Sequence, residues 1–185
     1  MRKWIIASTL ILSCAGPVTA ADRPASAETC AACHGANGVS SNPEWPNLAG
    51  QHQEYLAIQI RAFRDGIRDN PPMAPFVDKL SDADIDALAA WFAAQPAARS
   101  ANGDNALVSR GEHLSGYCKA CHGMQGRPAA NEWPILAGQQ AAYLVKQMGL
   151  YKSGGRVNPL MRAALNQFGD SEFAALAAYY SQLEP

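Results

Sequence analysis

Residues 30–34 read Cys30-Ala-Ala-Cys33-His34, and residues 118–122 read Cys118-Lys-Ala-Cys121-His122. The pattern Cys-x-x-Cys-His is the attachment signal for c-type haem, because two thiols one helical turn apart can add to the two vinyl groups and the next imidazole can reach the iron. A structural zinc site would need four ligands, and each motif offers three. A thioredoxin-like dithiol expects a strand-and-helix setting that the sequence does not show. The two motifs therefore predict two covalently bound haem c groups.

The two motifs belong to a tandem repeat with an offset of 88 residues (118 − 30). The same offset aligns many other positions, among them Trp45-Pro46 with Trp133-Pro134, Gln51 with Gln139, Tyr55 with Tyr143, Gln59 with Gln147, Arg68 with Arg156, and Met73 with Met161. Residues 95–105 are rich in Pro, Ala, Ser, Asn and Gly, which marks a linker. We therefore expect two domains of one fold, residues 21–100 and 101–185.

The spacing of apolar residues predicts an all-α fold. Leu56, Ile60, Phe63 and Ile67 follow the helical spacing i, i+4, i+7, i+11, and the second copy repeats this stripe between residues 144 and 155. Each copy ends in a second predicted helix, which starts near Ser81 or near Gly169. The first copy has a short lead-in before its first cysteine, so its opening helix should be the shorter one. The loops at 35–46 and 123–134 are long and polar, so each small domain has few residues with which to fill a hydrophobic core. The haem would complete that core.

Two matched methionines are the candidates for the sixth iron ligand. Met73 lies 39 residues after His34 (73 − 34), Met161 lies as far after His122, and both fall in predicted loops before the last helix. A lone methionine is more often core filler, but these two match across the repeat and follow an Asn-Pro pair. A thioether ligand raises the reduction potential and closes the iron to oxygen or peroxide. The sequence thus predicts an electron carrier, with no catalytic residue and with the metal ligands His34, Met73, His122 and Met161.

Other matched residues leave alternatives open. The carbonyl of Pro46 or Pro134 could accept the second N–H of the iron-bound histidine, or each could be an ordinary loop proline. A further set of matched residues could bond to the haem propionates. For its aromatic members core packing is favoured instead, and for its arginines a solvated surface. The set consists of Trp45, Trp133, Tyr55, Tyr143, Arg68 and Arg156. His52 and His113 lack a histidine at the matched position, so we expect both on the surface.

The N-terminus predicts export. Arg2 and Lys3 precede an apolar run at 4–15, and Val18-Thr19-Ala20 provides the small residues of a cleavage site, so residues 1–20 are predicted to be a signal peptide cleaved after Ala20. The run is too short to span a bilayer. The predicted location is the periplasm, an oxidising compartment. The formal net charge of −1 gives no indication of nucleic-acid binding.

The order of these motifs resembles that of class I c-type cytochromes, twice over, and the tandem form resembles the cytochrome c4 family. The resemblance implies two cytochrome c domains that pack about a pseudo-two-fold axis, each wrapping one haem with His/Met ligation. Carried over to this sequence, it places covalent attachment and ligation at Cys30, Cys33, His34, Met73, Cys118, Cys121, His122 and Met161.

The resemblance also implies a function. Members of the family carry electrons between a redox donor and an acceptor in a respiratory chain, typically to a terminal oxidase among membrane-bound complexes, and often associate loosely with the membrane. The alternative is the haem c subunit that accepts electrons in a flavin-containing dehydrogenase of the sulfide dehydrogenase type. The sequence has no dinucleotide-binding glycine motif, so that alternative requires a flavoprotein partner. A dihaem peroxidase would need an open iron, against which the matched methionines argue.

Overall fold

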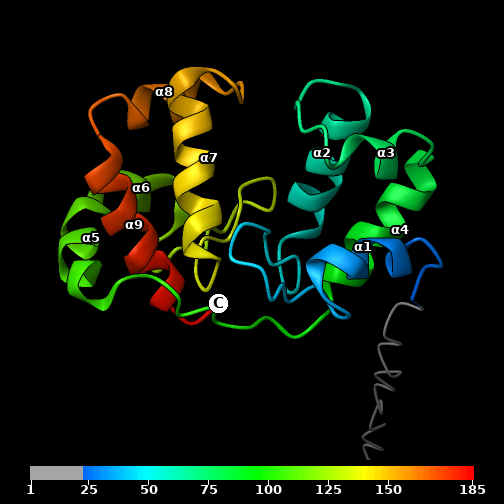
Figure 1. Cartoon of the computed structure of the whole chain (residues 1–185), viewed down its shortest axis with the longest axis horizontal. Helices are drawn as coiled ribbons and strands as arrows, with labels where there is room; N and C mark the ends of the chain where they lie inside the picture. The colour runs from blue at the N-terminus through cyan, green and yellow to red at the C-terminus, as the bar shows by residue number, and fades with distance from the viewer. Residues whose placement is uncertain (1–22) are drawn as a thin grey trace, which may run out of the picture.

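The computed structural model describes residues 23–185, so the predicted signal peptide lies outside the described residues. The chain forms two helical lobes joined by an extended segment (Figure 1). The first lobe contains α1 (Ala27–His34), α2 (Gln53–Arg64), α3 (Ala74–Val77) and α4 (Asp82–Ala93). The second contains η1 (Asn105–Leu107), α5 (Val108–Leu114), α6 (Gly116–His122), α7 (Ala141–Ser153), α8 (Pro159–Leu165) and α9 (Asp170–Gln182). Residues 23–185 hold no strand, which confirms the all-α prediction.

The repeat in the sequence is a repeat in the structure. Helices α2 and α7, and likewise α4 and α9, begin at positions that are 88 residues apart (141 − 53 and 170 − 82). The opening of the first lobe is a single eight-residue helix, whereas α5 and α6 together open the second, as the lead-in lengths predict. Ser81 caps α4 in a capping box with Asp84, so that each residue bonds the backbone N–H of the other. No helix within residues 23–185 is long and apolar enough to cross a membrane.

Two details differ from the sequence-based expectation. Helix α2 ends at Arg64, so Ile67 lies beyond the helix and is 71% exposed instead of continuing the apolar stripe. The reason is Gly66, whose φ of +70° ends the helix in a left-handed turn, as Gly154 does for α7. Met161 does not lie in a loop, because it falls inside α8, whereas Met73 lies as expected in a turn, where it is the N-cap of α3. The prolines in the first turns of α3 and α8 fit a helix start, where no N–H is needed.

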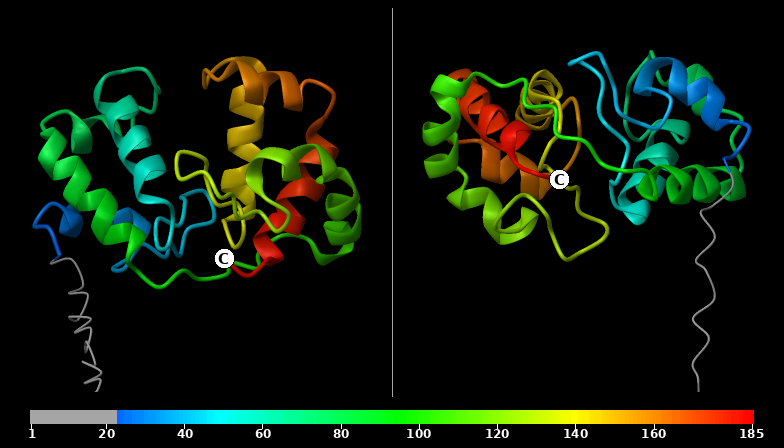
Figure 2. Two further views of the ribbon diagram at one scale, coloured as in Figure 1. Left: turned by 180° about the vertical axis from the view of Figure 1, so that it is seen from behind. Right: turned by 90° about the horizontal axis from the view of Figure 1, so that it is seen from below.

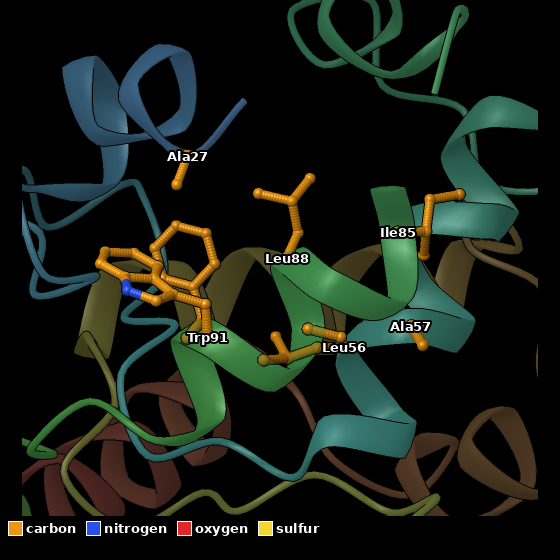
Figure 3. Close-up of a cluster of buried hydrophobic side chains, with 8 residues drawn as sticks. Ala27, Leu56, Ala57, Ile85, Leu88 and Trp91 are labelled. Atoms are coloured by element: carbon orange, nitrogen blue, oxygen red, sulfur yellow. The ribbon is translucent and has the colours of Figure 1, made fainter. Parts of the chain in front are cut away.

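Each lobe has its own hydrophobic core. In the first lobe, Ile85 and Leu88 of α4 pack with Leu56 of α2 and with Ala27 of α1, as Figure 3 shows. In the second lobe, a matching cluster joins α9 to α7, with Leu176 fully buried. Two separate cores are what a tandem repeat of one domain requires.

The closest helix contact of the second lobe is between α5 and α9. A β-carbon placed on Gly111 of α5 would lie 1.9 Å from the carbonyl oxygen of Ala175 and 2.8 Å from Cβ of Tyr179. Only a glycine allows the two backbones to approach this closely. Because residue 111 has no side chain, the opening helix α5 can pack directly against the last helix, α9.

Replacing Gly111 with alanine should lower the free energy of unfolding of the second lobe by about 1–3 kcal/mol, because the added methyl group forces the helices apart. The matched control is Gly149→Ala in α7, where a β-carbon would meet no atom within 4 Å. That change should be neutral or stabilising by up to about 1 kcal/mol, the helix propensity of alanine over glycine. Denaturant unfolding of the haem-loaded protein measures both, and equal stabilities would contradict the close contact.

The lobes meet through hydrogen bonds that are exchanged in both directions. Gln51 donates from Nε2 to the carbonyl of Ile135 (2.9 Å) and accepts at Oε1 from the N–H of Ile135 (2.8 Å). At the matched positions, Gln139 donates to the carbonyl of Asn47 (2.9 Å) and accepts from its N–H (2.7 Å). This reciprocity shows the expected pseudo-two-fold relation between the lobes.

Two backbone hydrogen bonds repeat the same exchange. The N–H of Tyr55 donates to the carbonyl of Asn131, and the N–H of Tyr143 donates to that of Pro43, each at 3.0 Å. Both bonds join the first turn of one long helix to the loop of the other lobe. Helices α2 and α7 consequently face each other across the lobe boundary, as Figure 1 and the left view of Figure 2 show.

Candidate haem-binding sites and the interface between them

The two motif histidines are buried at the ends of α1 and α6. His34 and His122 are each 7% exposed. Nδ1 of His34 donates to the carbonyl of Pro46 (3.0 Å), and Nδ1 of His122 donates to that of Pro134 (3.2 Å). Because a carbonyl can only accept, the hydrogen sits on Nδ1, and the lone pair of Nε2 is available to a metal. Of the two roles considered for the prolines, the structure shows the carbonyl acceptor.

Burial also sets the charge of these histidines. Desolvation lowers the pKa of both imidazoles below the ordinary histidine value, and the hydrogen bond to the proline carbonyl only partly opposes this. The neutral imidazole is the form that binds a metal. Both rings are thus held in the tautomer and protonation state that an axial ligand needs.

All four motif cysteines are free thiols. Cys30 and Cys118 pack against the hydrophobic cores of their lobes, and desolvation raises the pKa of both thiols. Cys121 is exposed. In the second lobe, one thiol therefore faces the core and the other lies at the surface, so a group bonded to both would have one edge near solvent.

The two methionines are half-buried. Met73 comes directly before α3 and Met161 lies in α8, and these two short helices are at the end of each lobe away from the linker (Figure 1). Met161 packs against the core of the second lobe, and its N–H is capped by the side chain of Asn158 (3.1 Å). Met148 of α7 packs against the same core. The matched pair Met73 and Met161 thus comes from corresponding places in the two lobes.

Arg68 and Arg156 are buried, which corrects the expectation of a solvated surface. They are 9% and 7% exposed. Arg68 donates to Oε1 of Gln59 (2.8 Å) and of Gln147 (2.7 Å), and Arg156 donates to the same oxygens of Gln147 (2.8 Å) and Gln59 (2.6 Å). Each glutamine therefore accepts from both guanidinium groups. The expectation was wrong because each arginine would be at the surface of its own lobe, and only the other lobe covers it.

Two tyrosines extend this arginine pair symmetrically. The hydroxyl of Tyr143 accepts from Arg68 (3.1 Å), and that of Tyr55 accepts from Arg156 (3.0 Å). Although burial raises the pKa of Tyr143, the charges of both arginines outweigh it and lower the pKa. The boundary between the lobes is therefore strongly positive at this point.

The arginine pair has no carboxylate to balance its charge within residues 23–185, where neither guanidinium takes part in a salt bridge. Burying a charged group costs free energy unless an opposite charge pairs with it, and burying two like charges side by side costs more. The pair is therefore a candidate binding site for an anionic group.

Three other expectations were tested by the packing. His113 is exposed as predicted, but His52 is half-buried and its Nδ1 donates to the carbonyl of Trp133 across the lobe boundary (2.9 Å). Trp45 is 40% exposed, so it is not a core residue. The sequence reasoning also assigned no role to Gln59 and Gln147, although their match across the repeat was a visible signal.

Comparison with known proteins places the chain in a family. Residues 22–92 match the family model described as cytochrome c oxidase, cbb3-type, subunit III. Cytochrome c4 of Pseudomonas aeruginosa is 33% identical over an alignment that covers 99% of this chain and 100% of that protein. This chain belongs to the cytochrome c4 family. The cytochrome c4 structure from Acidithiobacillus ferrooxidans superposes with a TM-score of 0.78 at 33% identity, covering 84% of this chain and 99% of that one.

Membership in the cytochrome c4 family establishes the cofactor and the general role. The chain carries two covalently bound haem c groups and belongs to the electron-transfer cytochromes. Another relative, from Thiomonas intermedia, is 34% identical over 97% of this chain and 90% of its own length, and is named thiosulfate dehydrogenase electron acceptor. The features described above fit haem c: free thiols, an imidazole with an available Nε2, and an uncompensated cationic pair.

Proposed function

We propose that this cytochrome c4 is a periplasmic electron shuttle in which each lobe binds one haem through a histidine and a methionine. The observation that carries the proposal is the buried histidine at the end of the Cys-x-x-Cys helix in each lobe. Its Nδ1 donates a hydrogen bond to a proline carbonyl, which fixes the ring. The residues assigned to covalent attachment are Cys30, Cys33, Cys118 and Cys121, and the assigned axial ligands are His34, Met73, His122 and Met161.

The haem, once bound, supplies the one-electron chemistry of its iron. The chain's residues set the conditions for that chemistry. The proline carbonyls fix the plane of each imidazole and increase its basicity, because they accept its second N–H. The methionine sulfur favours the reduced state and leaves no position open to oxygen or peroxide. This combination suits electron transfer without further reaction.

The arginine pair, Arg68 and Arg156, is assigned to the carboxylate edges of the two haems. Haem propionates are anionic, and the pair is buried at the lobe boundary without a carboxylate from the described polypeptide. Arg68 and Arg156 would then hold the carboxylates of both cofactors at the boundary between the lobes.

Optical spectroscopy of the purified protein tests the ligand assignment. The oxidised protein should show the weak sulfur-to-iron band near the red edge of the spectrum, and the reduced spectrum should not change under carbon monoxide. Both results are expected because methionine closes each iron. A missing band together with a carbon monoxide shift would mean an open iron, and would replace the shuttle with an enzyme.

The proposed electron acceptor is a terminal oxidase in the membrane. Washed membranes that contain the oxidase should consume oxygen when the reduced protein is added, at a rate that saturates with its concentration. The second candidate is acceptance of electrons from a dehydrogenase, which the relative from Thiomonas intermedia favours by its name. Thiosulfate-dependent reduction by a cell extract, together with no oxidation by the membranes, would favour this second role.

Export is tested by the mass of the mature protein. Cleavage after Ala20 should give a chain that begins at Ala21 and is recovered from the periplasmic fraction with its haems attached. A mature N-terminus that retains the leader would contradict the proposed location.

A further inference from the structure

The side chain of Tyr180 in α9 has a buried hydroxyl with no hydrogen-bond partner among the described residues. Its ring lies against Gly126, where an added β-carbon would be 2.9 Å from the ring atom Cδ1. In the first lobe, Phe92 lies in the same way against Gly38, with the corresponding distance of 2.8 Å. The two rings thus occupy matched places, and the difference between the lobes is one hydroxyl group.

A second hydroxyl distinguishes the same place in the two lobes. Ser115 is fully buried, and its matched residue in the first lobe is Ala27, which is also fully buried. The hydroxyl of Ser115 donates to the carbonyl of Glu112 (2.6 Å), so its hydrogen is already used. The second lobe therefore holds two buried hydroxyls where the first has only apolar atoms.

Both hydroxyls lie beside Cys118, the first cysteine of the second haem motif and the one that faces the core. Cys118 packs against the core cluster that contains Tyr180, and its N–H donates to the carbonyl of Ser115 (2.8 Å). The pKa of Tyr180 is raised, first by burial and then by the neighbouring Cys118. In the first lobe, the corresponding cysteine Cys30 packs against the core cluster that contains Phe92 and Ala27, neither of which carries a hydroxyl.

A buried hydroxyl without a hydrogen-bond partner is rare in a native protein, so we expect the Tyr180 hydroxyl to have a partner when the haem is bound. The sulfur of Cys118 becomes a thioether when the haem attaches, and a thioether can accept a hydrogen bond but no longer donate one. Two acceptors then lie beside the unused hydrogen of Tyr180: this sulfur, and the hydroxyl oxygen of Ser115, whose own hydrogen is bonded to Glu112. The donor withdraws electron density from the cofactor's edge and so favours the reduced iron, since hydrogen bonds around a haem tune its potential.

We propose that the Tyr180 hydroxyl donates a hydrogen bond to the sulfur of Cys118 in the haem-loaded protein and raises the reduction potential of the second haem relative to the first. This inference rests on the proposed attachment of haem at Cys118. Tyr180 is a positioning residue in this role, because it acts on the cofactor through the sulfur. It gives the shuttle a preferred place for a single electron, in the second lobe.

The test is a potentiometric titration of the haem-loaded protein and of Tyr180→Phe, with the two haems distinguished by nuclear magnetic resonance. Removing the hydroxyl should lower the potential of the second haem alone. The equilibrium constant for sharing one electron between the haems should shift toward the first haem by up to about tenfold, because the potential senses only the part of the hydrogen-bond energy that differs between the two oxidation states. Tyr179→Phe, which removes a neighbouring hydroxyl from the same helix, should leave both potentials unchanged.

The reciprocal variant Phe92→Tyr adds the hydroxyl to the first lobe and should raise the potential of the first haem. Intact mass counts the haems in every variant. If two haems are attached and Tyr180→Phe and Phe92→Tyr both leave the potentials at their wild-type values, the hydrogen bond is refuted while the attachment stands. If the wild-type chain carries fewer than two haems, the proposed function itself fails, and this inference fails with it.

Discussion

Replacing Cys30 and Cys33 together with serine should leave one covalently bound haem per chain and unfold most of the first lobe. The attachment chemistry needs both thiols, and the helices of this lobe enclose a small core in which Leu88 and Phe92 are among the few large, fully buried side chains. Domains of this size bury too little apolar surface to be stable without help. Intact mass measures the number of haems, and circular dichroism measures the loss of helix.

The mirror variant, Cys118→Ser with Cys121→Ser, should remove the other haem and unfold the second lobe in the same way. A further control is Cys30→Ser alone, which retains Cys33 and should keep a haem on a single thioether bond. Two haems on the first double variant would refute the attachment assignment. Full helix content with one haem would instead refute the role of the cofactor in completing the core.

The second large effect is expected from Met161→Ala, which should open one iron per chain to an external ligand. With the thioether removed, the reduced protein should bind one carbon monoxide per chain, compared with none for the wild type, and the potential of the second haem should fall. Titration of the reduced protein with carbon monoxide, followed at the Soret band, measures the stoichiometry. Met73→Ala should have the same effect on the first haem.

Met148→Ala is the matched control, because Met148 packs against the same core from α7 but is not assigned as a ligand. Because Met148 is half-buried, the change should destabilise the second lobe by about 0.5–3 kcal/mol, without carbon monoxide binding. Carbon monoxide binding by the Met148 variant and not by the Met161 variant would exchange the two roles. Binding by neither would leave the sixth ligand with another residue.

Much of the fold could be predicted from the sequence, because its signals are local or repeat. The Cys-x-x-Cys-His motifs fix the last residues of α1 and α6, and the constant offset predicts that α7 repeats α2. The predicted helix start near Ser81 agrees with α4, which has Ser81 as its N-cap. Helix ends were less predictable, since Gly66 stopped α2 before the apolar stripe reached Ile67.

The contacts between the lobes could not be predicted in the same way. The burial of Arg68 and His52 depends on where the second lobe lies, and no short stretch of sequence encodes that position. An arginine just past the end of a helix is normally solvated, so the surface was the reasonable expectation. The roles of Pro46 and Pro134 also required coordinates, because a backbone carbonyl has no sequence signature.

The exchanged hydrogen bonds of Gln51 and Gln139 have a consequence for how the two halves of the chain can differ. Each lobe gives the other the same contact that it receives, which is the isologous arrangement of a symmetric homodimer. Here the linker makes the pairing intramolecular, so the two partners need not be identical. At matched positions the first lobe has Asn47 where the second has Ile135, and Phe92 where the second has Tyr180. A homodimer must change both of its halves at once, whereas this chain can give each half a different task.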